Sequence, residues 1–274
     1  MAAPLRLLVA LPAEARPIVA HYRLERQADA GGFPFYRGDG DVALIVSGPG
    51  KLAAAAAVAT LHLAAGAAPH AAWLDVGLAG HRHRPVGEAV VAGRVCDRGS
   101  GECWYPPQLW RPPPATGEVL TVEEVERRYD GPWFYDMEAS GFCAAASRLA
   151  SLELVQVLKI VSDNRRRPPA GLDKHRVAAL VEARLGEIDA LARATRALAA
   201  ELGRLAAPPP MYDELVATLR FTASERRQLR RQLRRWQALA ASTPLPPELL
   251  AGCRRGGELN RRLDAWLDHL AVAS

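Results

Sequence analysis

Asp41-Val-Ala-Leu-Ile-Val-Ser-Gly-Pro-Gly-Lys51 and the alanine-rich run that continues to residue 65 decide the fold class. Residues 41–47 are mostly apolar and rich in β-branched side chains, which predicts a buried strand. Gly48-Pro49-Gly50 ends this strand with residues that favour a turn. Lys51–Ala65 contain neither Pro nor Gly, so the run predicts a buried helix. A continuous apolar strand followed directly by a helix is typical of an α/β protein with a parallel sheet.

The same alternation of strand and helix continues on both sides of this stretch. Further strands are predicted at Leu7–Leu11, Ala72–Val76, Glu88–Val95, Gly117–Val122 and Leu154–Val161, and further helices at Glu138–Leu152 and Asp173–Leu205. We therefore expect an α/β fold with a layered, mixed or parallel sheet flanked by helices.

A proline run divides the chain. Pro208-Pro209-Pro210 stops the preceding helix, because proline lacks an amide hydrogen and clashes with the turn before it. The segments beyond it are all predicted to be helical: Tyr212–Phe221, Ser224–Ala241, Pro247–Cys253 and Glu258–Val272. We expect an α/β domain over residues 1–207 and a basic, all-helical C-terminal extension over 208–274. The extension is too short for a large core, so we expect it to pack on the α/β domain or on a second subunit.

The composition is that of a globular protein. The chain has 274 residues, of which 49% are hydrophobic, and no apolar run approaches the roughly 20 residues that a membrane span needs. The apolar run near the N-terminus is short and is followed by charged residues, which predicts a strand rather than a signal peptide. The four cysteines form no Cys-x-x-Cys pair, so we expect no disulfide, no catalytic thiol and a cytoplasmic location.

Positive charge gathers in the extension. The formal net charge is +5, and residues 208–274 hold eleven Arg against seven acidic residues. The six arginines between Arg226 and Arg235 fall on one helical stripe, with Leu229, Leu233 and Trp236 on the opposite side. The chain has 32 Arg and three Lys, which indicates a GC-rich coding bias. We therefore favour an amphipathic helix with a solvated arginine face over nucleic-acid binding.

Acidic residues and glycine turns follow the predicted strands. Glu14 follows the first strand, Gly48-Pro49-Gly50 the second and Gly77-Leu78-Ala79-Gly80 the third, while Ser162-Asp163 ends the last. Ligand sites of open α/β sheets lie beyond the carboxyl ends of their strands. These residues, together with Glu138 at a helix start, are therefore expected to meet at one edge of the sheet.

This ordered set of motifs resembles the nucleoside phosphorylase and nucleosidase superfamily, which includes methylthioadenosine/S-adenosylhomocysteine nucleosidase. The motifs are Leu7–Glu14, an opening strand and acidic turn; Ser47–Lys51, a glycine turn; Val76–Gly80 and Val86–Val91, a second glycine turn and the next strand; Asp136–Ser140, a helix start; and Val161–Asp163, a strand end. The resemblance covers residues 5 to about 205, and the short stretch before residue 136 is more similar to the hopanoid-associated phosphorylase-like branch.

The resemblance implies a role for each residue. Asp163 would be the general acid at purine N7, with Ser162 helping to place it. Glu138 would hold the ribose hydroxyls, Met137 would pack on the sugar, and Glu14 would orient a water nucleophile. From the residues alone, the favoured interpretation is a structural one: Glu14 as a solvated loop residue or helix-start acid, Asp163 as a helix N-cap and Met137 as a core residue.

The remaining residues of the implied binding site are Gly48, Gly50, Gly77, Leu78 and Lys159. Phosphorylases of the family have Arg and Ser at positions that here are Asp75 and Leu78, and neither residue favours phosphate. Lys159 stands where the hydrolytic relatives have Arg, which keeps the charge but loses the planar fork.

The sequence therefore predicts an N-ribosyl hydrolase that cleaves the glycosidic bond of a purine nucleoside or a nucleoside-bearing metabolite. Two alternatives stay open. One is a nucleoside-binding module without turnover, whose basic helical tail contacts a partner, and the other is phosphorolysis. No metal and no cofactor is expected. Because relatives of the family self-associate, a homo-oligomer is expected as well.

Overall fold

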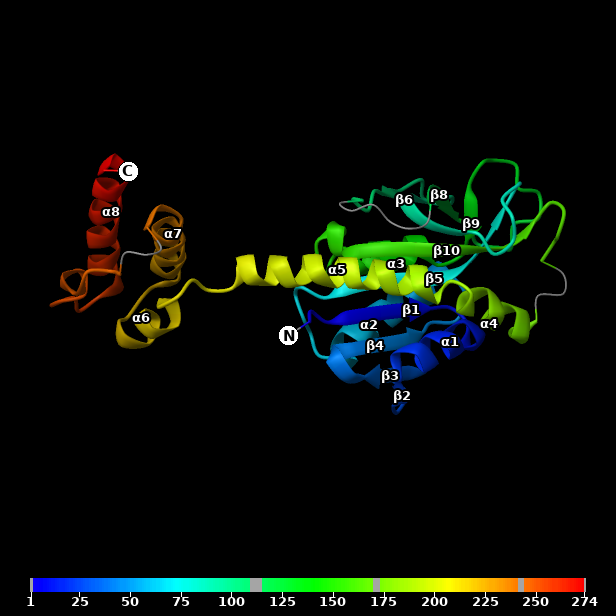
Figure 1. Cartoon of the computed structure of the whole chain (residues 1–274), viewed down its shortest axis with the longest axis horizontal. Coiled ribbons are helices and arrows are strands. Elements are labelled where there is room, and N and C mark those ends of the chain that lie inside the picture. Colours follow the sequence, from blue (N-terminus) through cyan, green and yellow to red (C-terminus); the bar gives the residue numbers. More distant parts are fainter. Residues whose placement is uncertain (1, 109–114, 170–172, 241–243, 274) are drawn as a thin grey trace. The chain divides into compact units, whose positions relative to one another are not determined.

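The computed structural model describes residues 2–108, 115–169, 173–240 and 244–273. The chain divides into two compact units, Met1–Arg204 (unit 1) and Leu205–Ser274 (unit 2) (Figure 1). The sequence analysis places this division after residue 207. Each unit encloses a hydrophobic cluster of its own.

Unit 1 alternates strands and helices along the chain. Its strands are β1 (Leu5–Val9), β2 (Glu25–Arg26), β3 (Phe35–Gly38), β4 (Val42–Val46), β5 (Ala72–His81), β6 (Ala89–Asp97), β7 (Cys103–Trp104), β8 (Ala115–Thr121), β9 (Phe134–Asp136) and β10 (Val155–Asn164). Its helices are α1 (Pro12–Tyr22), α2 (Lys51–Ala64), α3 (Ala139–Ala146), α4 (Lys174–Glu182) and α5 (Leu185–Ala206).

The strands form one mixed sheet, which confirms the predicted fold class. β1 pairs in parallel with β4 and with β5, and β5 pairs in parallel with β10. β10 then pairs with β6, β6 with β8, β8 with β9, and β9 returns to β5, so these five strands close into a ring. The parallel strands β1, β5 and β10 end on the same side, and their carboxyl ends lie beside the β9–α3 connection.

Helices α2 and α3 pack closely at their N-terminal ends. A Cβ atom added to Gly141 would lie 1.9 Å from the main-chain oxygen of Lys51, a distance that no side chain tolerates. Glycine at this position therefore lets the start of α3 approach the start of α2. The contact brings the Gly48-Pro49-Gly50 turn beside Glu138, two segments that are far apart in the sequence.

Several predicted boundaries are wrong. The helix predicted over 173–205 is two helices, α4 and α5, with a break at Ala183 and Arg184. At the break the Arg184 guanidinium donates a 2.7 Å hydrogen bond to the main-chain oxygen of Gly87, a tertiary contact that helical periodicity does not encode. Helix α3 ends at Ala146, not at residue 152, because the chain turns into a short 3₁₀ segment, Leu152–Leu154, before β10.

Unit 2 is a helical unit, as predicted. It contains α6 (Tyr212–Thr218), α7 (Ala223–Ala240), a 3₁₀ turn at Pro247–Leu249 and α8 (Gly256–Ala273). Ala241, the predicted end of the α7 segment, lies outside the described residues. Helix α7 begins with a capping box: the Thr222 hydroxyl accepts from the Glu225 amide, and the Glu225 carboxylate accepts from the Thr222 amide.

The expectation that the apolar face of α7 is buried against the α/β domain or a second subunit is wrong. Leu229, Leu233 and Trp236 are buried, but their cluster is formed by the helices of unit 2 itself. The other buried members are Tyr212, Leu215, Leu259, Leu263 and Leu267. Helix α8 supplies a second leucine stripe with four-residue spacing, so α7 and α8 bury each other's apolar faces.

The arginine stripe lies at the surface of unit 2. Arg226, Arg227, Arg231, Arg234 and Arg235 are exposed. Arg230 is half-buried, and its guanidinium carbon lies 5.0 Å from the centre of the Tyr212 ring. The stripe therefore has the solvated character expected of the outer face of an amphipathic helix.

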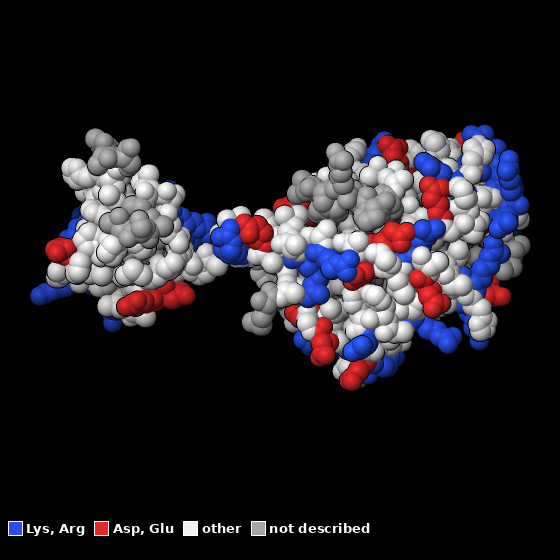
Figure 2. Space-filling model, in the orientation of Figure 1, with Lys and Arg blue, Asp and Glu red and all other residues white. Residues whose placement is uncertain are grey.

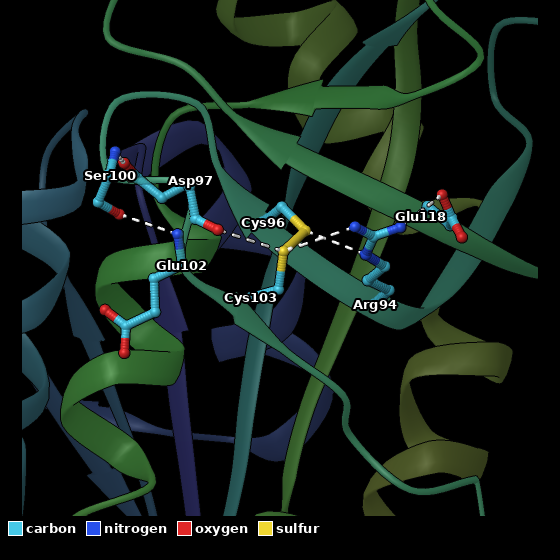
Figure 3. Close-up of a disulfide and its surroundings, with 8 residues drawn as sticks. Arg94, Cys96, Asp97, Ser100, Glu102, Cys103 and Glu118 are labelled. Carbon is cyan, nitrogen blue, oxygen red and sulfur yellow. Dashed lines mark hydrogen bonds and ion pairs between the residues drawn. A yellow bond between two sulfur atoms is a disulfide. The ribbon is translucent and has the colours of Figure 1, made fainter.

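The expectation of no disulfide is also wrong. Cys96 at the end of β6 is disulfide-bonded to Cys103 on β7 (Figure 3). The intervening turn reverses the chain, and the antiparallel pairing of β6 with β7 places the two cysteines opposite each other. This pairing is a consequence of a local hairpin that the sequence analysis did not predict.

Within the described part of the chain, no helix combines the length and the apolar character needed to cross a membrane.

The separate core of unit 2 gives a stability prediction. Leu233→Ala should destabilise unit 2 by about 2–5 kcal/mol, because it leaves a cavity among fully buried leucines. Hydrogen exchange should then show faster exchange of α7 and α8 amides and unchanged exchange in β1, β4 and β5. Leu239→Ala is the matched control, since Leu239 on the same helix is 38% exposed and should lose little. Equal loss of protection in both units would contradict independent cores.

Candidate active site

A cavity of about 260 Å³ opens at the carboxyl ends of β1, β5 and β10. Six of the residues singled out in the sequence line it: Glu14, Leu78, Met137, Glu138, Ser162 and Asp163. The lining also holds Glu126 and Asp136, so five carboxylates and no Lys or Arg side chain are among its described residues. A neutral group therefore fits this cavity better than an anion.

Glu14 is held by main-chain donors. Its Oε2 accepts hydrogen bonds from the amides of Ala10 (2.9 Å) and Leu11 (2.8 Å), and its Oε1 accepts one from Leu78 (3.1 Å). Burial raises the pKa of Glu14 to about 7, although the Leu11 hydrogen bond and the charge of Lys159 act in the opposite direction. Glu14 can therefore exchange a proton near neutral pH from a fixed position.

Glu138 stands at the start of α3 and contacts the glycine turn after β4. Its Oε1 accepts a 2.8 Å hydrogen bond from the Gly50 amide. Gly50 has φ of +101°, a conformation that favours glycine and aims this amide at the carboxylate. Burial, with a smaller contribution from the negative charge of Asp136, raises the pKa of Glu138 to about 7.

Asp163 lies near the end of β10, and each of its two carboxylate oxygens accepts a hydrogen bond from a hydroxyl group. The Ser162 hydroxyl donates to Oδ1 and the Tyr129 hydroxyl donates to Oδ2. A Cβ atom on Gly80 would lie 2.7 Å from Asp163 Oδ2 and 2.7 Å from the Tyr129 ring, so glycine on β5 leaves room for this pair. The two hydroxyls fix the orientation of the Asp163 carboxyl group toward the cavity.

Lys159 lies under the cavity rather than in its wall. Its Nζ is 2.8 Å from Asp75 Oδ2 and 2.9 Å from Asp136 Oδ2, and all three side chains are buried. Burial alone would lower the pKa of Lys159, but the charges of Asp136 and Asp75 outweigh it and hold the pKa well above its usual value. The sequence analysis treated Asp75 as a residue facing phosphate; instead it neutralises Lys159.

The predicted glycines also lie outside the cavity wall. Gly48 and Gly50 belong to the turn whose exposed Pro49 reaches the cavity, and Gly48 has φ of +75°. A Cβ atom on Gly77 would lie 3.2 Å from Lys159 Nζ and 3.5 Å from Glu14 Oε1. Gly77 therefore lets the Lys159 ammonium approach the base of the site.

The sequence analysis missed Tyr129. This residue is buried in the connection between β8 and β9 and has φ of +50°, a region that few non-glycine residues occupy. Glu126 holds the strained segment, because its Oε1 accepts hydrogen bonds from the amides of Arg127, Arg128 and Tyr129. No periodicity or spacing marks a single tyrosine in an irregular segment, so the sequence offered no signal for it.

The surface around the site differs in charge from its lining. Figure 2 shows Lys and Arg side chains gathered at the end of unit 1 that carries the β10–α4 connection, where Arg165, Arg166 and Arg167 are exposed. A wider depression of about 790 Å³ adjoins the cavity and shares Val122, Val125 and Glu126 with it. The surface around the cavity is thus partly basic, whereas the lining of the cavity is acidic.

Solved structures similar to this chain are nucleosidases. The 5′-methylthioadenosine nucleosidase of Arabidopsis thaliana superposes with a TM-score of 0.58 at 14% identity, over 71% of this chain and 96% of the enzyme. The methylthioadenosine/S-adenosylhomocysteine nucleosidases of Chlamydia trachomatis and of Colwellia psychrerythraea, the latter in complex with adenine, each give a TM-score of 0.55 at 18% identity. They cover 70% and 72% of this chain and 99% and 96% of their own.

The chain has the nucleosidase fold. No protein-family model matches the sequence, and no curated protein matches it. The nucleosidase fold predicted from the motif resemblance is therefore confirmed by structure, at identities where sequence comparison finds nothing. In this nucleosidase fold, Glu14, Glu138 and Asp163 line one cavity.

The buried state of Glu14 predicts a pH dependence of stability. Glu14 has a pKa of 4.5 in the unfolded chain and about 7 in the folded protein. At a pH between these two values, Glu14 keeps in the folded protein a proton that it releases on unfolding. The free energy of unfolding should therefore fall as the pH rises through this window, with about 3 kcal/mol coming from Glu14. In Glu14→Gln this part of the decrease should disappear.

Denaturant unfolding across this pH range measures the effect. Glu124→Gln is the control, because Glu124 is an exposed glutamate and should leave the pH profile unchanged. An identical profile for Glu14→Gln and the wild type would show that Glu14 does not carry the buried proton.

Proposed function

We propose that the protein is an N-ribosyl hydrolase that cleaves the glycosidic bond of a purine nucleoside or a nucleoside-bearing metabolite. The observation that carries the proposal is the convergence of three buried carboxyl groups, Glu14, Glu138 and Asp163, on one cavity of about 260 Å³. Cleavage of such a bond builds positive charge on the sugar and negative charge on the base. The reaction needs carboxylates near the sugar and a proton donor near the base.

Asp163 is the proposed general acid. Its carboxyl group would protonate the leaving base, at N7 of a purine, while Ser162 and Tyr129 keep it oriented. Each carboxyl oxygen has two lone pairs, so the hydrogen bond from Tyr129 to Oδ2 still leaves that oxygen able to contact a ligand. The hydrophobic side chains of Val122 and Val125 beside it provide an apolar surface for a base.

Glu14 is the proposed group that orients water, and Glu138 the group that binds ribose hydroxyls. Three amides hold Glu14 in place, so it can position a water without a change in its own conformation. Its pKa of about 7 lets it act as a base from neutral pH upward. Met137, which is half-buried in the cavity wall, would pack against the sugar.

Water is favoured over phosphate as the nucleophile. The ammonium group of Lys159, which lies under the cavity, is already paired with the carboxylates of Asp75 and Asp136. Leu78 offers no side-chain donor, and its amide is already bonded to Glu14. A phosphate placed there would face the carboxylates of Glu14 and Glu138, which repel it.

The similar structures support the choice of a purine nucleoside. The Colwellia enzyme was solved with adenine, and a Helicobacter pylori enzyme, a variant with Asn in place of an aspartate, was solved with 5′-methylthioadenosine in its active site. Both ligands contain adenine. For the present protein, a 5′-modified adenosine is therefore the first substrate to assay.

The substitution Asp163→Asn tests whether Asp163 is the general acid. The variant should lose about 10²–10⁴ of the rate of base release, because an amide cannot supply the proton. Tyr129→Phe should fall between the wild type and Asp163→Asn, since the acid stays but one of its orienting bonds is lost. Release of free base from adenosine and 5′-methylthioadenosine measures both, with the exposed Asp130→Asn as control. Wild-type binding of nucleoside without any release would support a binding module instead.

An assay without phosphate tests whether water is the nucleophile. We expect the wild-type protein to release base at the same rate with and without phosphate, with sulfate at equal ionic strength as control, and to form the free sugar. A sugar 1-phosphate product would establish phosphorolysis and overturn this part of the proposal.

A further inference from the structure

Asp97, at the end of β6, binds two elements that flank the candidate active site. Its side chain is buried and accepts hydrogen bonds from Lys51 Nζ (2.9 and 3.0 Å), from the Ser140 hydroxyl (2.8 Å) and from the Ser100 amide (2.8 Å). Burial alone would raise the pKa of Asp97, but the hydrogen bonds from Lys51, Ser100 and Ser140 outweigh it and hold the pKa at about 2. Asp97 is therefore an anion and only accepts hydrogen bonds.

Two of these partners sit close in sequence to Glu138, which binds ribose in the proposed function, and to Gly50, whose amide holds Glu138. Lys51 is the first residue of α2 and directly follows Gly50, and Ser140 lies two residues after Glu138. The Gly50 amide and Glu138 Oε1 are themselves joined by a 2.8 Å hydrogen bond. Asp97 thus ties together the two segments on either side of that bond, without lining the cavity itself.

The disulfide closes the turn that presents Asp97. Cys96 directly precedes Asp97 and is bonded to Cys103, and the Asp97 and Gly101 amides complete the turn through 2.9 Å hydrogen bonds (Figure 3). Cys103 is half-buried whereas Cys96 is buried, so Cys103 is the more accessible of the two cysteines. Opening the disulfide removes the covalent bond across this turn, so that only hydrogen bonds then hold Asp97 in place.

We propose that Asp97 is a positioning residue for Glu138 and that the Cys96–Cys103 disulfide makes this positioning sensitive to dithiol reductants. The proposal rests on the function proposed above. In the redox step, a dithiol thiolate attacks the Cys103 sulfur and displaces the Cys96 thiolate, and the second thiol of the reductant then releases Cys103. Both cysteines end as protonated thiols, and the dithiol becomes a cyclic disulfide.

The kinetic test compares oxidised and reduced protein. Since Glu138 would bind ribose in both the ground state and the transition state, its displacement should raise KM about tenfold or more, with a much smaller effect on kcat. Dithiothreitol should produce this change in the wild type. Cys96→Ser with Cys103→Ser should show it without reductant, and Cys253→Ser, which alters a free cysteine, should respond like the wild type. Unchanged KM after reduction would overturn the redox control.

A second test does not depend on activity. Because coupling is reciprocal, loss of the Asp97 contacts should favour opening of the disulfide. The equilibrium constant for reduction by dithiothreitol should rise on the order of fivefold in Asp97→Asn and also in Ser140→Ala, a milder change that removes a single contact. Glu102→Gln, in the same turn but with an exposed side chain, should match the wild type.

The two tests separate the proposals. Equal reduction constants for the wild type, Asp97→Asn and Ser140→Ala would refute the coupling of Asp97 to the disulfide. If the wild-type protein cleaves no nucleoside while Asp97→Asn and Ser140→Ala still show raised reduction constants, the proposed function is refuted and the coupling stands.

Discussion

One buried ammonium group, that of Lys159, offsets the negative charge of the carboxylates buried beneath this site. Lys159 lies between Asp75 and Asp136, with each of the three side chains almost fully excluded from water. Burial of an ion costs several kcal/mol unless opposite charge lies close by, and here one cation serves two direct partners. The three residues belong to β10, β5 and β9, the strands at which the sheet closes into a ring. The charge contact therefore joins three of the strands that form the ring.

The same cation acts on the residues of the cavity above it. Its charge lowers the pKa values of Glu14 and Glu138, although burial still holds both at about 7. Without it, two further carboxyl groups would sit in an acidic, desolvated wall with no opposing charge. Burial raises the pKa values of both glutamates to near neutrality, and main-chain hydrogen bonds from Leu11 and Gly50 act with the charge of Lys159 in the opposite direction.

Sequence analysis succeeds in this protein where a signal is local. The strands β4 and β10 are continuous apolar runs, α2 is marked by alanine, and Glu14 and Asp163 follow strands whose carboxyl ends must meet in a parallel sheet. The placement of the site could therefore be predicted from order alone. Its chemical details could not, because Lys159 and its two partners come from three strands whose register no periodicity specifies.

The failures have a common cause, which is contact between segments distant in sequence or irregular in structure. Tyr129 reaches Asp163 from a segment without periodicity. The break before α5 depends on a hydrogen bond from Arg184 to Gly87, and the disulfide depends on a hairpin of β6 and β7. In unit 2 the leucines of α7 were recognised, but their partner face on α8 was not considered, so a self-contained core was taken for a docking surface.

The self-contained core of unit 2 has a consequence for how the sequence can change over time. A substitution among the buried leucines of α7 and α8 removes contacts of unit 2 itself, so these positions are constrained by the stability of that unit. Substitutions at the exposed arginines of α7 remove little buried contact within unit 2, so that face can vary in sequence while the core of the unit is kept. Unit 2 therefore combines a constrained core with a surface that is free to drift or to be adapted by selection.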